Sequence, residues 1–428
     1  MNPKNTEVEI RRLRCHIIKD TFEAQGFNIS SSSSDANLVW WDGSIPLDEF
    51  SSIKPEQHVN KIPGMDVLCY KSTLFQALNQ MQPLFPNYYT FFPKTFLLPH
   101  QYSEFLKEHQ KLNGRHRDAP TWIVKPRAGC CGAGIRLVQI PYDLAHDTTP
   151  SIVQRYVSPF LIDSHKFDFR LYLLISSLHP FTLYIYNEGI ARFCTQKYHP
   201  PTRQNLSDKF MHITNTAINA ENKISKDFEY TRSASSVFEA ISESDPYGAQ
   251  LWEKIKKIST LTLLALYPQI VTSVASHCGK KKQEKTIEPS NDPMNRFFHI
   301  LGIDIMINDQ CDPMVLELND NPSMKVGVPF EDVLKRKLLS DTLKVVTLDG
   351  STPPNIDSTG WQKLLPVDDG THFTTVIRTI QQRALNVFGP KTPVNSLISQ
   401  QAVKSIVYPK LTQDKSKLKK PVYRYHFQ

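Results

Sequence analysis

Two carboxylates and an amide stand close together in the run GIDIMINDQCDPMVLELNDNPSM (302–324). Asp304 lies inside one apolar stretch, while Glu317 and Asn319 lie at the end of the next. Because strand side chains alternate between faces, we expect Asp304 opposite its isoleucine neighbours, and Glu317 and Asn319 on one shared face. Oxygen ligands of this kind suit Mg²⁺, which keeps water and substrate phosphates as further ligands. A solvated sheet face would carry the same residue types, but two adjacent carboxylate-bearing strands favour a magnesium site.

A second charged group occupies alternate positions in SHKFDFR (164–170). A strand would direct Lys166, Asp168 and Arg170 to one side. A solvent-exposed ladder of ion pairs has the same spacing. Read alone, Arg192 in ARFCT is a surface residue, and Thr214 and Asn215 in MHITNTAIN belong to a loop.

The glycine-rich segment RAGCCGAG (127–134) follows the apolar run WIVK. Backbone N–H groups of such a loop can surround a phosphate, with Lys125 as a point charge beside them. An ordinary hairpin turn has a similar composition. The segment is neither a Walker A loop nor a dinucleotide-binding fingerprint, because it lacks G-K-[ST] and no helix follows it.

Short β-rich runs must position these groups. We predict a hairpin of 121–126 and 134–140, strands at 151–157, 169–177 and 182–186, and a turn at 187–189 into a strand at 190–195. A further hairpin joins 298–307 to 313–319. Helices are predicted at 250–277, at 331–346 and near 374–387, and the serine run 30–34 predicts a loop or boundary.

Composition describes an ordinary globular chain of 428 residues with 40% hydrophobic and 21% charged residues. The N-terminus lacks an apolar signal region, and no apolar run approaches the roughly 18–20 residues that span a bilayer, so neither a secretory signal nor a membrane protein is expected. The seven cysteines form no C-x-x-C pair, which argues against zinc. A net charge of +8 suits an acidic partner or a solvated basic surface.

Taken in order, these segments resemble the tubulin–tyrosine ligase-like family, a branch of the ATP-grasp ligases. The resemblance covers roughly residues 59–345. The segments that carry it are VNKIPGMDVLCYKSTLFQALNQM, FFPKTFLLP, WIVKPRAGCCGAGIRLV, IVQRYVSPFLIDSHKFDFRLYLL, NEGIARFCTQKY, NLSDKFMHITNTAIN and ILGIDIMINDQCDPMVLELNDNPSM.

The resemblance implies an α/β (α+β) ATP-grasp fold, in which central and C-terminal subdomains hold ATP between them behind a smaller N-terminal domain. We place a partly flexible N-terminal segment at 1–37, the N-terminal domain at 38–120, the catalytic core at 121–345, and a C-terminal extension with a basic tail at 346–428.

The resemblance also implies roles for individual residues. Lys125 and Lys166 would reach the ATP phosphates under the loop that contains Cys131 and Gly132. The adenine hinge would run from Gln154 through Arg155 and Tyr156 to Val157. Further nucleotide contacts would come from Phe167, Asp168, Thr214 and Asn215. Mg²⁺ would bind Asp304, Glu317 and Asn319, while Arg170 and Arg192 would face phosphate and the carboxylate of the incoming amino acid.

The closest branch is that of the polyglutamylases, which implies ligation of free L-glutamate to acidic tubulin tails through an acyl-phosphate. Two departures concern substrate choice. Ala133 stands where the family usually has a basic or polar residue, and Thr216 and Ala217 replace its usual Tyr-Ser pair. A glycylase, a ligase for another acidic protein and a catalytically inactive microtubule-binding member remain open.

The implied location is cytoplasmic, on the microtubule cytoskeleton, including cilia and basal bodies. No nucleic-acid-binding motif appears, so neither nucleic acid nor membrane is expected as a partner. Residues 410–428 carry six Lys and Arg against one Asp. This tail could attract acidic tubulin tails or simply be solvated.

Overall fold

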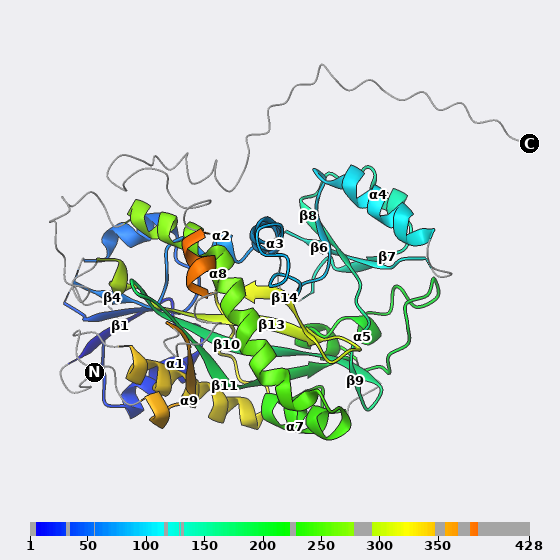
Figure 1. Cartoon of the computed structure of the whole chain (residues 1–428). Helices are drawn as coiled ribbons and strands as arrows, with labels where there is room; N and C mark the ends of the chain where they lie inside the picture. Colours follow the sequence, from blue (N-terminus) through cyan, green and yellow to red (C-terminus); the bar gives the residue numbers. More distant parts are fainter. Residues whose placement is uncertain are drawn as a thin grey trace, which may run out of the picture.

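The computed structural model describes residues 6–30, 35–54, 56–114, 119–127, 129, 132–222, 228–277, 293–346, 356–366 and 377–383. Their strands form three sheets with helices packed around them (Figure 1). This mixed α/β arrangement agrees with the fold class expected from the sequence.

The first sheet is parallel and built from the N-terminal part of the chain. Its order is β2-β1-β3-β4, with β1 at Glu7–Arg11, β2 at Asn28–Ser30, β3 at Leu38–Trp41 and β4 at His58–Val59. Helix α1 (His16–Ala24) connects its first two strands. The boundary expected between residues 37 and 38 is therefore wrong, because β1 pairs directly with β3 across it.

The second sheet is antiparallel and has the order β5-β8-β6-β7. Its strands are β5 (Thr95–Leu98), β6 (Trp122–Pro126), β7 (Arg136–Val138) and β8 (Ser151–Arg155), and α4 (Tyr102–Asn113) packs beside β5. The β6–β7 hairpin was predicted. The expected boundary at residue 120 is wrong, because Phe96 and Phe105 share a buried cluster with Trp122.

The third sheet is the largest, with the order β12-β11-β10-β13-β14; β15 also pairs with β11, and β9 with β10. Its strands are β9 (Leu161–Ile162), β10 (His165–Leu178), β11 (Phe181–Phe193), β12 (Thr231–Ser233), β13 (His299–Ile307), β14 (Pro313–Asn319) and β15 (Trp361–Leu365). The predicted β13–β14 hairpin is present. Strand β15 joins the predicted C-terminal extension to the catalytic core.

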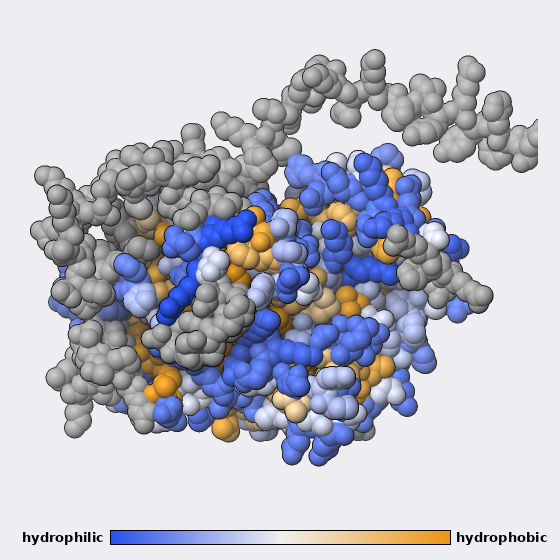
Figure 2. All heavy atoms as spheres, viewed as in Figure 1, coloured by the Kyte–Doolittle hydropathy of each residue, from blue (hydrophilic) through white to orange (hydrophobic). Residues whose placement is uncertain are grey.

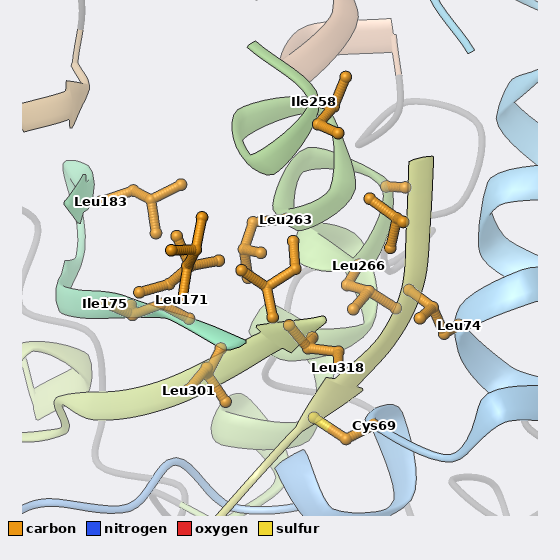
Figure 3. Close-up of a cluster of buried hydrophobic side chains, with 14 of the residues drawn as sticks. Cys69, Leu74, Leu171, Ile175, Leu183, Ile258, Leu263, Leu266, Leu301 and Leu318 are labelled. Atoms are coloured by element: carbon orange, nitrogen blue, oxygen red, sulfur yellow. The ribbon is translucent and has the colours of Figure 1, made fainter. Parts of the chain in front are cut away.

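Helix α8 (Leu251–His277) lies across one face of this sheet (Figure 1). Figure 3 shows Leu263 and Leu266 of the helix packed toward Leu301 and Leu318 of the sheet, with Leu74 of α3 alongside. The remaining helices are α2 (Met65–Leu68), α3 (Lys71–Met81), α5 (Lys209–His212), α6 (Thr216–Asn219), α7 (Ala234–Ser244) and α9 (Pro329–Val345), and residues 377–383 are also helical.

Residues 187–189 lie inside β11 rather than in the predicted turn, and the strand bulges between Ile185 and Gly189. The pairing of β10 with β11 shifts register between Leu171 and Leu173, and the strand then continues to Phe193. Gly189 lies so close to β10 that an added Cβ would stand 2.5 Å from the carbonyl oxygen of Arg170. The Asn-Glu-Gly sequence therefore accommodates a close strand contact, which a turn-like composition does not reveal.

Among the residues that the structure describes, one helical segment, Gly248–His277, is long and apolar enough to cross a membrane. The expectation that no apolar run approaches the length of a bilayer span is therefore wrong, as judged by length and composition. However, 83% of its apolar window is buried inside the protein, as expected for a core helix. Figure 2 shows that the described surface on this side of the molecule is mainly hydrophilic.

Candidate active site

Two neighbouring cavities collect most of the residues that the sequence singled out. The first lies between the second and third sheets and is lined by Lys125, Gln154, Arg155, Tyr156, Val157, Lys166, Asp168, Arg192, Thr214, Asn215, Asp304 and Glu317, among others. The second, of about 580 Å³, shares Arg192, Asn215 and Glu317 with it and adds Gly132, Arg170, Thr216, Ala217 and Asn319. Residues far apart in the sequence thus converge on one site.

Lys125 is a buried cation at the wall of the first cavity, with 6% of its surface exposed. Its Nζ donates to Gln154 Oε1 over 2.9 Å, and Gln154 Nε2 donates to Thr95 Oγ1 over 2.9 Å. Burial lowers the pKa of Lys125 to about 8, partly opposed by the nearby carboxylate of Glu317. A phosphate would restore the charged form, so Lys125 suits a polyanionic ligand.

Lys166 occupies the opposite wall. Its Nζ donates to the hydroxyl of Tyr156 over 3.1 Å and to the carbonyl of His212 over 2.8 Å. Burial lowers its pKa. The imidazole of His212 accepts or donates at Nδ1 with Tyr156, and its buried Nε2 has no hydrogen-bond partner in the described residues. His212 is therefore a polar cavity residue that the sequence did not indicate.

The predicted hinge is formed by the chain after β8. The backbone N–H groups of Arg155 and Tyr156 are already bonded, to Lys94 and Thr121 respectively. The N–H of Val157 makes no hydrogen bond within the described part of the chain, although its residue lines the cavity. A backbone donor of this kind can pair with an acceptor on the adenine edge, so the hinge fits a nucleotide.

Two arginines and two aspartates form a buried cluster on the floor of the site. Arg192 donates twice to Asp168, over 2.7 Å each, and once to Asp304 over 2.7 Å. Arg170 makes a bidentate pair with Asp304. Thr214 Oγ1 also donates to Asp168 over 2.7 Å. Strand register creates the cluster, because Asp168 pairs with Arg192 and Arg170 with Asp304.

The cluster fixes the ionisation of its members. Burial alone would raise the pKa of Asp304, but Arg170 and Arg192 outweigh it and hold that pKa well below its usual range. Burial alone would lower the pKa of Arg192, but Asp168 and Asp304 overcome it. Asp304, Arg170 and Arg192 are therefore charged at neutral pH. The alternate residues Lys166, Asp168 and Arg170 all line the two adjoining cavities.

The predicted carboxylate pair is brought together by β13 and β14. Asp304 stands opposite Glu317 in the register, and Glu317 and Asn319 both line the second cavity, as alternation predicted. No group of three or more His, Cys, Asp or Glu in the described residues could hold a metal. Two carboxylates and an amide nevertheless fit Mg²⁺, which in nucleotide sites binds one or two carboxylates together with phosphates.

Two of the expected nucleotide contacts, Gly132 and Phe167, do not line the first cavity. Cys131 lies outside the described residues. Gly132 has φ of +77°, and an added Cβ would meet Ile218 and Asn215, so a glycine keeps the loop close to the site. The ring of Phe167 is buried in the core, where it stacks on Phe193 at 5.3 Å between centroids, and it lines neither cavity, so the expected nucleotide contact of this residue stays a prediction.

Several cavity residues were missed by the sequence reasoning, namely Lys71, Tyr172, Asn321, Lys325, Glu331 and Lys335. Lys71 begins α3, and its Nζ lies 2.9 Å from Glu317 Oε2. The sequence around Lys71 does not indicate a site residue, because only tertiary packing brings α3 to the cavity. Arg232 lines neither cavity; it pairs with Asp163 and packs over the ring of Phe193.

The mixed α/β fold is that of an ATP-grasp-like family. The model of the tubulin-tyrosine ligase family matches residues 51–355, and the chain belongs to that family. It is 36% identical over 323 residues to a probable beta-tubulin polyglutamylase of Tetrahymena thermophila, covering 73% of this chain and 26% of that protein. It is 37% identical over 304 residues to mouse tubulin polyglutamylase TTLL11, covering 68% and 40%.

Human tubulin polyglutamylase TTLL6 is 31% identical over 346 residues, covering 80% of this chain and 37% of that protein. The chain therefore spans only a quarter to two-fifths of the length of these relatives.

Proposed function

We propose that this protein is a Mg²⁺- and ATP-dependent ligase that joins free L-glutamate to glutamate side chains of acidic tubulin tails. The observation that carries the proposal is the convergence of buried Lys125 and Lys166 with the Asp304–Glu317 pair in one cavity. The names of the relatives supply the substrate class, and family membership supplies the reaction class. Its setting would be the microtubule cytoskeleton of the cytoplasm.

Mg·ATP would supply the phosphoryl group that converts the acceptor carboxylate into an acyl-phosphate, from which the amine of glutamate displaces phosphate. In this proposal Asp304, Glu317 and Asn319 hold the metal. Lys125 and Lys166 neutralise phosphate charge from opposite walls, where burial strengthens each interaction.

Arg170 and Arg192 both bond to Asp304 and so hold its carboxylate in place beside Glu317. Arg170 has one terminal nitrogen bonded to Asp304, and it also lies 4.0 Å from Glu317. Both guanidinium groups line the second cavity, where the incoming amino acid would present its own carboxylate. Positioning and electrostatics would then provide most of the rate enhancement, without a covalent enzyme intermediate.

The test is incubation of the full chain with microtubules, Mg·ATP and one isotopically labelled amino acid at a time. Mass spectrometry of the tubulin tails should find glutamate in amide linkage to a γ-carboxylate. Addition of glycine alone would identify a glycylase, a possibility raised by Thr216 and Ala217 in the second cavity. Transfer to another acidic protein but not to tubulin would identify a different acceptor.

A further inference from the structure

The loop that follows Asn319 is held from behind by a buried lysine outside the predicted site. Lys61 is only 6% exposed. Its Nζ donates to the carbonyl of Asp320 over 3.1 Å and to Asn321 Oδ1 over 2.9 Å. No carboxylate lies within ion-pair distance of Lys61 in the described residues. These two oxygens, together with the nearby charges of Asp320 and Asp42, compensate for its burial.

A histidine holds the same carbonyl from a second direction. His299 accepts at Nδ1 from the backbone N–H of Ile62 over 3.0 Å, which places the ring proton on Nε2. That Nε2 then donates to the carbonyl of Asp320 over 2.6 Å. Ser44 also donates to Asp320 Oδ2 over 2.9 Å. The loop is thus tied to the N-terminal sheet region and to β13 at once.

The contact with Lys61 determines which way the amide of Asn321 points. An ammonium group only donates hydrogen bonds, so the atom that faces Lys61 must be the amide oxygen. The NH₂ group of Asn321 makes no hydrogen bond within the described part of the chain. Asn321 lines both the small cavity around Lys61 and the second cavity of the active site.

The second cavity has the charge that would receive a carboxylate beside this amide. Its lining contributes five cationic side chains, Lys71, Arg170, Arg192, Lys325 and Lys335, against two acidic ones, Glu317 and Glu331. Lys335 is itself fixed by Glu331 over 2.8 Å, and the same carboxylate accepts from the backbone N–H of Gly327. Both ends of the 320–327 loop are therefore anchored by buried lysines.

We propose that Asn321, oriented by Lys61, is a specificity-determining residue whose NH₂ donates a hydrogen bond to a carboxylate oxygen of the bound substrate. That carboxylate belongs either to the free amino acid or to the acceptor side chain. The inference rests on the proposed ligase function. Lys61 is a positioning residue in this arrangement, because it acts on substrate only through Asn321.

The decisive variant is Asn321→Asp, which keeps an oxygen for Lys61 but replaces the donor with an acceptor. Steady-state rates are measured in two arms, varying glutamate at saturating acceptor peptide and varying peptide at saturating glutamate. We expect KM to rise about tenfold or more in one arm, while KM for ATP and the thermal midpoint stay unchanged. The arm that responds identifies which carboxylate Asn321 contacts.

Two substitutions of Lys61 test the orienting contact. Lys61→Gln retains an N–H donor for the loop oxygens, whereas Lys61→Met removes it. We expect Lys61→Met to raise the same KM as Asn321→Asp, and Lys61→Gln to restore most of it. Lys54→Gln is the matched control, because Lys54 pairs with Asp35 at the surface and lies outside both cavities.

The outcomes separate this inference from the proposed function. If the unmodified chain ligates no amino acid to any acidic acceptor, the proposed function fails first. If it ligates glutamate but Asn321→Asp changes neither KM, the inference alone is wrong. Equal losses for Lys61→Met and Lys61→Gln would also contradict it, because simple loss of stability would then explain both.

Discussion

Lys71 Nζ and Glu317 Oε2 lie 2.9 Å apart, so the residue proposed as a metal ligand is also the partner of a lysine from another part of the fold. Lys71 begins α3, while Glu317 belongs to the edge strand β14. The same ammonium group lies 3.4 Å from the carbonyl of Gly129, in the glycine-rich loop. This contact links the loop expected over the phosphates to the carboxylate expected on the metal.

Glu317→Gln should preserve the fold and remove activity. The side chain is partly exposed, and an amide of equal size can still accept from Lys71, so the thermal midpoint should change little. An amide cannot supply the anionic ligand, and we expect ligation to fall by about a hundredfold or more. Initial rates at saturating Mg²⁺ check this, with the exposed Glu243→Gln as control. Near-normal turnover would overturn the metal assignment.

Binding of ATP should weaken above pH 8. Burial lowers the pKa of Lys125 to about 8, so the unliganded side chain loses its charge as the pH rises past that value. KM for ATP should therefore rise between about pH 8 and pH 9, by up to about tenfold per unit. Lys125→Arg stays charged in this range and should show a flat profile. A rise of equal slope in that variant would mean that another group titrates.

The same shift makes a prediction about stability. Between about pH 8 and the ordinary lysine value of 10.5, the unfolded chain binds the proton that the folded chain has lost. The free energy of unfolding should therefore increase with pH in this window. Burial also lowers the pKa of Lys61 to about 8. Lys61 should therefore likewise increase the free energy of unfolding as the pH rises. Urea unfolding of the wild type and of Lys125→Arg can separate the two contributions.

Periodicity sufficed for the parts of the site that depend on strand register. Asp304, Glu317 and Asn319 could be placed because side-chain alternation and a short hairpin turn fix their relation. The bulge between Ile185 and Gly189 could not be predicted. Asn, Glu and Gly suit a turn equally well, and only the close approach of β10 distinguishes the two structures. Lys71 and Asn321 were missed for a related reason, since tertiary packing alone brings them to the cavity.

The domain limits failed where composition was the guide. A serine run suggested a boundary before residue 38, yet β1 and β3 pair across it. The aromatic cluster of Phe96, Phe105 and Trp122 likewise joins residues on both sides of the expected boundary at 120. Pairing between strands that are far apart in the sequence depends on the tertiary structure. The residues of local turns do not indicate it.

Arg192→Lys should affect the amino acid more than ATP. Arg192 donates three hydrogen bonds to Asp168 and Asp304. Truncating the whole side chain would therefore leave two buried carboxylates without this partner and destabilise the fold. Lysine keeps the charge but loses the bidentate geometry. We expect KM for glutamate to increase at least about tenfold and KM for ATP to change little. Equal increases would assign Arg192 to phosphate instead.

Amino-acid selectivity should respond to Thr216 and Ala217, which both line the second cavity. The double change Thr216→Tyr with Ala217→Ser restores the residues usual in the family. We expect a higher ratio of kcat/KM for glutamate over glycine and an unchanged KM for ATP. Competition between two labelled amino acids measures the ratio directly. No change in that ratio would show that other lining residues determine the choice.

The basic segment 410–428 lies outside the described residues, and its role remains a prediction from charge. Six Lys and Arg against one Asp give it a formal charge of +5. Attraction to acidic tubulin tails would be screened as the Debye length falls from about 10 Å at 0.1 M salt to about 3 Å at 1 M. Deleting the segment should therefore weaken co-sedimentation with microtubules and flatten its salt dependence.

Catalysis on a short acceptor peptide separates this tethering role from a role in the reaction. None of the residues proposed to contact ATP, metal or amino acid lies in 410–428, so the truncated chain should modify an untethered peptide at nearly the normal rate. A free peptide with the same composition as the tubulin tail, and not attached to a microtubule, provides the matched substrate. If the truncated and full chains co-sediment equally at low salt, the segment does not hold the microtubule, and solvation explains its charge.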